Sequence, residues 1–110
     1  MKHRLLNEII PVTTSHGCGT KRVLLAKEDT QTNLTQIAVT GLKQGERSEM
    51  HVHPTMEEVF LIRKGTVKIC METEETVCHA DECICIAAGE RHALEALTDA
   101  EILTIGCATE

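Results

Sequence analysis

The stretch GERSEMHVHPTMEE, residues 45–58, brings two histidines and a glutamate close together: His51, His53 and Glu58. A further histidine, His92, ends the later stretch AAGERH, residues 87–92. The chain has only six histidines, so half of them lie in these two short stretches. Imidazole and carboxylate groups together are suited to Mn, Fe, Co, Ni, Cu or Zn. The pattern therefore predicts a site for one divalent transition metal, whose identity stays open within this set.

The spacing indicates how these groups could meet. His51 and His53 are two residues apart, so on an extended segment their side chains share a face. Glu58 follows His53 by five residues, and on an unbroken strand that odd separation would aim it at the opposite face. Pro54 cannot donate a ladder hydrogen bond, so we expect the chain to turn there. After such a turn, Glu58 and the later His92 could converge with the other two histidines inside a barrel.

Short β-type runs extend outward from this stretch on both sides. Turn-forming residues separate them at short, even intervals, which is typical of an antiparallel sandwich or barrel. The runs predicted as strands are residues 22–26, 34–40, 58–63, 66–71, 83–87, 92–97 and 101–106. Residues 5–10 could form a helical turn or a first strand, and no longer window has a helical period.

Length and composition restrict the class of protein. A chain of 110 residues corresponds to one domain, here 1–110. With one Phe and no Trp or Tyr, it has no surface on which bases could stack. Its net charge of −6 and the absence of a basic run disfavour nucleic acid and anionic membranes as partners.

The N-terminus lacks the apolar stretch of a signal peptide, so the chain is expected to be cytoplasmic. Its six cysteines are then expected to be reduced thiols packed like small hydrophobic residues. The grouping of Cys78, His79, Cys83 and Cys85 does not have the spacing of a structural zinc site. Residues 83–87 are apolar on both faces, which indicates burial in the barrel or against a second subunit and favours a homodimer.

The two histidine stretches carry a family resemblance. The pattern Gly45-x5-His51-x-His53-x4-Glu58-x6-Gly65 is similar, position for position, to the first motif of the cupin superfamily. Residues 81–96 resemble the second motif, with His92 in place. They depart from it at Asp81, Ala87 and Ala96, where cupins usually have Gly, Pro and Asn. None of the departures removes a ligand.

The resemblance is to a small single-domain cupin of the conserved-barrel type, and it implies an all-β, double-stranded β-helix or jelly-roll barrel. It also implies that a divalent transition metal is held by His51, His53, Glu58 and His92. The function that it suggests is a metal-dependent small-molecule enzyme of dioxygenase, isomerase or lyase type. A non-catalytic cupin that binds or senses a small molecule is the alternative.

Residues near the two motifs are predicted to shape the site. Phe60, Ile62 and Leu94 share the strand faces of the ligands and should line the interior. With no other aromatic residue available, the pocket is expected to be aliphatic and narrow, formed by groups such as Met50, Val67, Ile69 and Met71.

The charged residues beside the ligands have simpler interpretations. Alternation along the strand directs Glu57 outward, away from Glu58. Arg47 and Arg91 could lie at the barrel mouth and pair with a substrate anion, but solvated surface positions are expected for each. The remaining histidines, His3, His16 and His79, lie far from both motifs in sequence and are expected at the surface.

Overall fold

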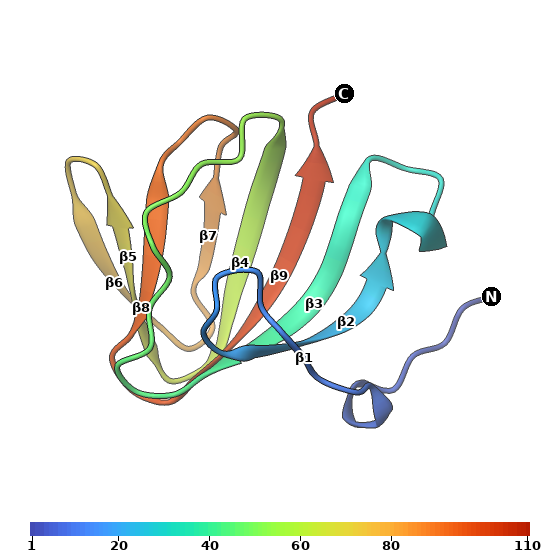
Figure 1. Cartoon of the computed structure of the whole chain (residues 1–110), viewed down its shortest axis with the longest axis horizontal. Coiled ribbons are helices and arrows are strands. Elements are labelled where there is room, and N and C mark those ends of the chain that lie inside the picture. The colour runs from blue at the N-terminus through green and yellow to red at the C-terminus, as the bar shows by residue number, and fades with distance from the viewer.

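The computed structural model describes residues 1–110 and is built from two antiparallel sheets that face each other (Figure 1). The larger sheet has the strand order β1-β2-β3-β9-β4-β7 and the smaller one β6-β5-β8. The larger sheet contains β1 (Val12–Thr13), β2 (Thr20–Ala26), β3 (Leu34–Leu42), β9 (Ala100–Ala108), β4 (Met56–Lys64) and β7 (Cys83–Ile86). The smaller sheet contains β6 (Glu75–His79), β5 (Thr66–Met71) and β8 (His92–Ala96). The predicted all-β fold is confirmed.

All seven predicted strands are present, with ends that differ by one or two residues at most places. Two strands were not predicted. The strand β1 has only two residues, and β6 is an edge strand of which only Cys78 is buried, so neither has a marked hydrophobic period. Within residues 5–10 the chain forms a single 3-10 turn, η1 (Leu6–Glu8), and a second one, η2 (Lys27–Asp29), follows β2.

Turn residues in both motifs have a left-handed backbone conformation, among them Gly65 in the first motif and Asp81 in the second. Gly65, between β4 and β5, has φ 83°, and a Cβ there would overlap the carbonyl oxygen of Asp99. Asp81 stands where the second motif usually has glycine, and it adopts φ 74°. Aspartate is one of the few non-glycine residues that visit this region routinely. The departure at Asp81 therefore preserves the turn that leads from β6 into β7.

The apolar core fills one end of the space between the sheets. Ile62 of β4 and Ile102 of β9 pair across the larger sheet and pack against Val67 and Ile69 of β5. Further along β4, the inward partners on β9 become smaller: Phe60 lies opposite Thr104, and Glu58 lies opposite Gly106. The loss of side-chain volume along β9 means that the other end of the barrel is not filled by core residues.

The cysteines differ in their surroundings. All six are unpaired thiols, and only Cys78 is buried. Cys18 and Cys70 are half-buried, whereas Cys83, Cys85 and Cys107 are exposed on the outer face of the larger sheet. The expectation that the cysteines pack as interior hydrophobic residues is therefore wrong for these three. The apolar run of β7 alternates: Ile84 and Ile86 face the core, and its two cysteines face out.

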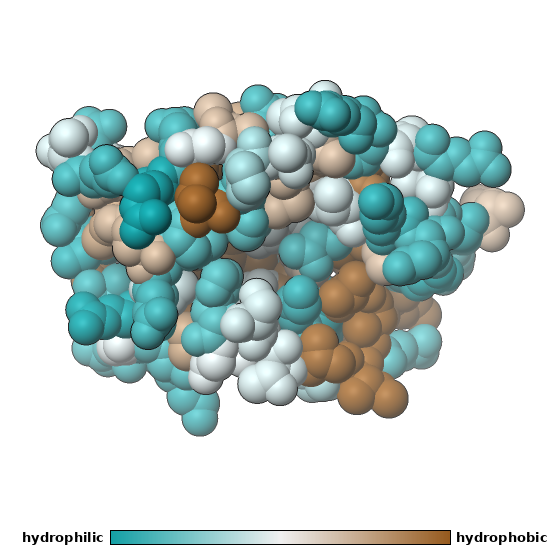
Figure 2. All heavy atoms as spheres, turned by 45° about the horizontal axis from the view of Figure 1, so that its top comes forward, coloured by the Kyte–Doolittle hydropathy of each residue, from teal (hydrophilic) through white to brown (hydrophobic).

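The face of the molecule in Figure 2 is mostly hydrophilic, with hydrophobic side chains gathered at its lower right. Large exposed apolar side chains occur in the N-terminal segment, at Leu5, Ile10 and Val12. No helix of the chain is long and apolar enough to cross a membrane.

Candidate metal centre

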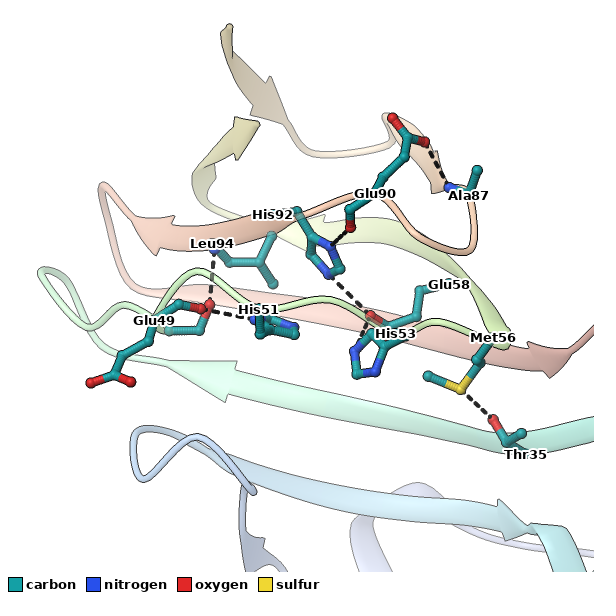
Figure 3. A network of polar contacts seen from close by, with 11 residues as sticks. Thr35, Glu49, His51, His53, Met56, Glu58, Ala87, Glu90, His92 and Leu94 are labelled. Atoms are coloured by element: carbon teal, nitrogen blue, oxygen red, sulfur yellow. Dashed lines mark hydrogen bonds and ion pairs between the residues drawn. The ribbon is translucent and has the colours of Figure 1, made fainter. Parts of the chain in front are cut away.

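The four predicted ligands come from three parts of the chain and meet in one place (Figure 3). His51 and His53 lie on the segment between β3 and β4, Glu58 lies on β4, and His92 begins β8. One ligand atom from each side chain lies within 4.8 Å of all the others. The carboxylate oxygen Oε1 of Glu58 is 3.0 Å from Nε2 of His53 and 3.3 Å from Nε2 of His92.

The backbone explains how residues so far apart converge. His51 and His92 form an antiparallel bridge with two backbone hydrogen bonds of 2.9 Å. The chain turns at residues 54–55, and β4 begins at Met56, as expected from Pro54. Beyond it, the amide of Gly89 donates to the carbonyl of His53 at 2.9 Å, which ties the second motif to the first.

Two of the imidazoles are oriented by main-chain carbonyls. Nδ1 of His51 lies 2.8 Å from the carbonyl oxygen of Glu49, and Nδ1 of His92 lies 2.9 Å from that of Glu90. A carbonyl oxygen can only accept, so each Nδ1 is assigned the proton. This leaves Nε2 of His92 directed at Glu58, as Figure 3 shows. Such outer hydrogen bonds fix the tautomer and the ring orientation of metal-binding histidines.

The charges of the cluster are coupled. Burial raises the pKa of the Glu58 carboxyl, but the hydrogen bond from His92 and the nearby histidine charges outweigh it, so that pKa lies below its usual value. Burial lowers the pKa of His92, but the hydrogen bond to Glu58 outweighs it and the net pKa is raised. For His51, burial dominates and lowers the pKa. Glu58 is thus held as a carboxylate that attracts positive charge.

The donor set fits a transition-metal ion. Three imidazole nitrogens and one carboxylate oxygen are ligands that such ions accept, and two of the four side chains, Glu58 and His92, are buried. A buried carboxylate facing two Nε2 atoms needs protons or a cation between the groups. A metal ion would supply that cation.

Comparison with protein families agrees with this geometry. The model of the cupin domain matches residues 38–106, which include all four ligands. The chain belongs to the cupin family. No curated protein matches the chain significantly.

Solved structures similar to this cupin include a predicted oxalate decarboxylase from Thermotoga maritima, with TM-score 0.88 and 24% identity over 98% of this chain and 99% of that one. Ectoine synthase from P. lautus superposes with TM-score 0.85 and 18% identity over 98% of this chain and 78% of that one. The cupin domain of Schizosaccharomyces pombe Cnp3 has TM-score 0.80 and 8% identity, over 96% and 73% of the two chains. These neighbours confirm the jelly-roll barrel.

A cavity of about 130 Å³ adjoins the cluster, which is room for a small organic molecule and not only for water. Most of the surface that its wall exposes is apolar, but 11 of its 17 lining residues are polar or charged, so the expected purely aliphatic wall is not what the fold provides. Phe60 and Leu94 line it as predicted, but Ile62 belongs to the closed core. The other predicted wall residues lie elsewhere: Val67 and Ile69 in the core, Met71 at a second cavity, and Met50 at the surface.

Part of the polar wall comes from β2 and β3, whose inward residues are polar at some positions and apolar at others, such as Leu42. The prediction of the wall residues used strand alternation only on the strands that carry the predicted ligands. The inward residues of β2 and β3 were therefore not predicted. The residues that these strands direct into the cavity include Lys21, Gln36 and Thr40.

His16 was expected at the surface and far from the site, and its placement is a correction. Its side chain is largely exposed, but its ring centroid lies 4.2 Å from that of His51, and it lines the cavity. Burial lowers the pKa of His16 and outweighs the opposing effect of the Glu58 carboxylate. The loop between β1 and β2 carries it there. No spacing rule connects residues so distant in sequence, so only the fold reveals this contact.

The charged neighbours of the ligands lie outside the cavity. Glu57 is exposed on the outer face of β4, as strand alternation predicts. Arg91 pairs with Glu72 at 3.2 Å, and Arg47 is exposed beside β8. Neither arginine lines the cavity, which agrees with solvated surface positions.

Proposed function

We propose that this cupin binds one divalent transition metal through His51, His53, Glu58 and His92. The observation that carries the proposal is the convergence of four ligand atoms within 4.8 Å around a buried carboxylate. The carbonyls of Glu49 and Glu90 would hold two imidazoles with Nε2 free to bind the ion. The ion could be Mn, Fe, Co, Ni, Cu or Zn, since the donor set suits each of them.

The metal centre would serve a small-molecule enzyme. Four protein ligands would leave two positions of an octahedral ion open, and the cavity adjoins the four side chains that would hold it. When bound, the ion would supply Lewis-acid or redox chemistry to a substrate oxygen, as in a dioxygenase, isomerase or lyase. Two structural neighbours have names that describe enzymes, a predicted decarboxylase and a synthase. The wall of the cavity would orient the substrate.

The test is elemental analysis of protein purified without a metal-affinity tag. We expect about one equivalent of transition metal per chain, and its loss in the double variant His51→Ala/His92→Ala. The matched control is His3→Ala/His79→Ala, which removes two exposed histidines outside the cluster. Full metal content in the first variant, with native circular dichroism, would refute the ligand assignment.

Proof that the protein binds metal would not show catalysis, which needs a separate test. Turnover of a small-molecule substrate that disappears on chelation and returns with metal would support an enzyme. Metal-dependent binding of the ligand without turnover would favour the sensing or capture role instead.

We also propose that two copies associate through the outer face of the larger sheet. Alternation directs Val59 and Leu61 of β4 and Leu103 and Ile105 of β9 outward, and they pair across the two strands. An apolar face of this kind suits a self-complementary contact about a two-fold axis.

Three exposed thiols are compatible with a reducing compartment, which supports the proposed cytoplasmic location.

A further inference from the structure

The cavity contains an inward-facing lysine, Lys21 of β2. In the larger sheet, β2 is separated from β4, the strand of Glu58, by β3 and β9. Lys21 lies opposite Thr40 of β3, and its ammonium donates to the side-chain oxygen of Gln36 at 3.3 Å. The lysine is half-buried and lines the same cavity as the metal cluster. Glu58 lines this cavity too, so the two charges share one compartment.

This ammonium has no carboxylate partner. On the outside of the barrel, Lys68 pairs with Glu75 and Glu95, at 3.6 and 3.2 Å. Lys21 forms no ion pair with any carboxylate of the chain, and its one side-chain hydrogen bond is to a neutral amide. An ammonium has three N–H donors, so donors remain free to face a ligand.

The charge of the cavity favours an anion. Glu58 is the only carboxylate among the lining residues, and it is already engaged by His53 and His92. With a divalent ion at the cluster, Lys21 and the ion together outweigh Glu58, so the cavity becomes positive. The protein as a whole carries a net charge of −6, which makes a positive cavity distinctive. Low-dielectric walls strengthen such a field and attract anions.

We infer that the cavity takes a small carboxylate whose anionic group pairs with Lys21 while its other end reaches the metal. The second half of this inference rests on the proposed metal site, and the first half does not. A single ammonium, helped by the Gln36 amide and the Thr40 hydroxyl, suits a monoanionic carboxylate. A phosphate would call for more charged donors, and no arginine lines the cavity.

The experiment measures binding of unbranched dicarboxylates from malonate to adipate, which vary the distance between the two ends. Co²⁺-loaded protein serves, because its visible spectrum reports ligands at the open metal positions, and calorimetry gives the affinity. The variants are Lys21→Met, which keeps the length without the charge, and Lys21→Arg, which keeps the charge. The control is Lys27→Met, at an exposed lysine outside the cavity. Succinamide serves as the uncharged probe.

We expect at least one dicarboxylate to bind wild-type protein, and the affinity to fall at least tenfold in Lys21→Met. Lys21→Arg should retain most of the affinity, Lys27→Met all of it, and succinamide should bind weakly. Equal affinity in wild type and Lys21→Met, or no binding by metal-loaded protein, would overturn the inference and leave the metal site standing. If the protein takes up no metal, the proposed function fails. Carboxylate binding that still depends on Lys21 would then support the anion site, and its absence would overturn it.

Discussion

Glu58 and His92 are the two buried members of the proposed metal-binding cluster, and each changes the protonation of the other. In the metal-free protein, a proton on Nε2 of His92 satisfies the carboxylate at 3.3 Å. A metal ion has to displace that proton, because only the neutral imidazole can donate its lone pair. Proton and metal are therefore competitors for the same atom.

We predict that metal affinity falls as the pH is lowered from about 8 to about 6, by about tenfold per pH unit for each proton displaced. The pKa of His92 is raised, so this residue holds its proton to higher pH than a free histidine does. Calorimetric titration with Co²⁺ at several pH values measures the slope. In Glu58→Gln the carboxylate is absent, so the fall should move to lower pH. An affinity that does not vary over this range would contradict the competition.

At the residue scale, the sequence predicted the residues that share a short motif and missed those that do not. His51, His53, Glu58 and His92 converge as their spacing indicated. His16 reaches the cluster from the loop before β2, and only the pairing of strands brings that loop to the site.

Among the elements, the tight turn at Gly65 joins β4 of the larger sheet to β5 of the smaller one. Its left-handed backbone and the close carbonyl of Asp99 both require a residue without a side chain. The two strands were predicted as residues 58–63 and 66–71, which leaves only residues 64–65 for the turn between them. By contrast, β6 was missed because an exposed edge strand with one buried residue has no hydrophobic alternation to read.

We predict that Gly65→Ala lowers the free energy of unfolding by about 3 kcal/mol or more, since it adds a steric overlap to an unfavourable φ. Gly17→Ala is the matched control: Gly17 has φ 77°, but a Cβ there would meet no atom within 4 Å. The control should lose only about 1–2 kcal/mol, the cost of the left-handed conformation alone. Urea unfolding of the metal-free proteins measures both. Equal losses would show that the contact with Asp99 is unimportant.

For the molecule as a whole, the sequence predicted the barrel but not which part of its interior is closed and which part is open. Ile62, Val67 and Ile69 were expected to line the pocket, and they form the closed core instead. The cavity depends on which residues of β2, β3 and β9 face one another, and this register is a property of the folded sheet. The scarcity of aromatic residues indicated an aliphatic pocket, whereas strand pairing places polar side chains there.

We predict that the protein is a dimer at micromolar concentration by light scattering. Leu103→Lys would place a charge on the outer face of β9 in both copies, so it should shift the protein to monomers. The control is Val77→Lys, at an exposed valine of β6 in the other sheet. A wild-type monomer, or an unchanged dimer in Leu103→Lys, would contradict the proposed interface.

The ligand set also spans the two sheets, since Glu58 belongs to the larger one and His92 to the smaller one. A bound ion would therefore act as a cross-link between two layers that otherwise meet here through apolar packing and the Glu58–His92 hydrogen bond. A cross-link that joins distant parts of a chain reduces the conformational entropy of its unfolded and locally unfolded states. Removal of the metal should let β8 separate from β4 in local openings, seen as faster amide exchange at this end of the barrel. The bound metal would then determine how often this end of the barrel opens, as well as the chemistry of the site.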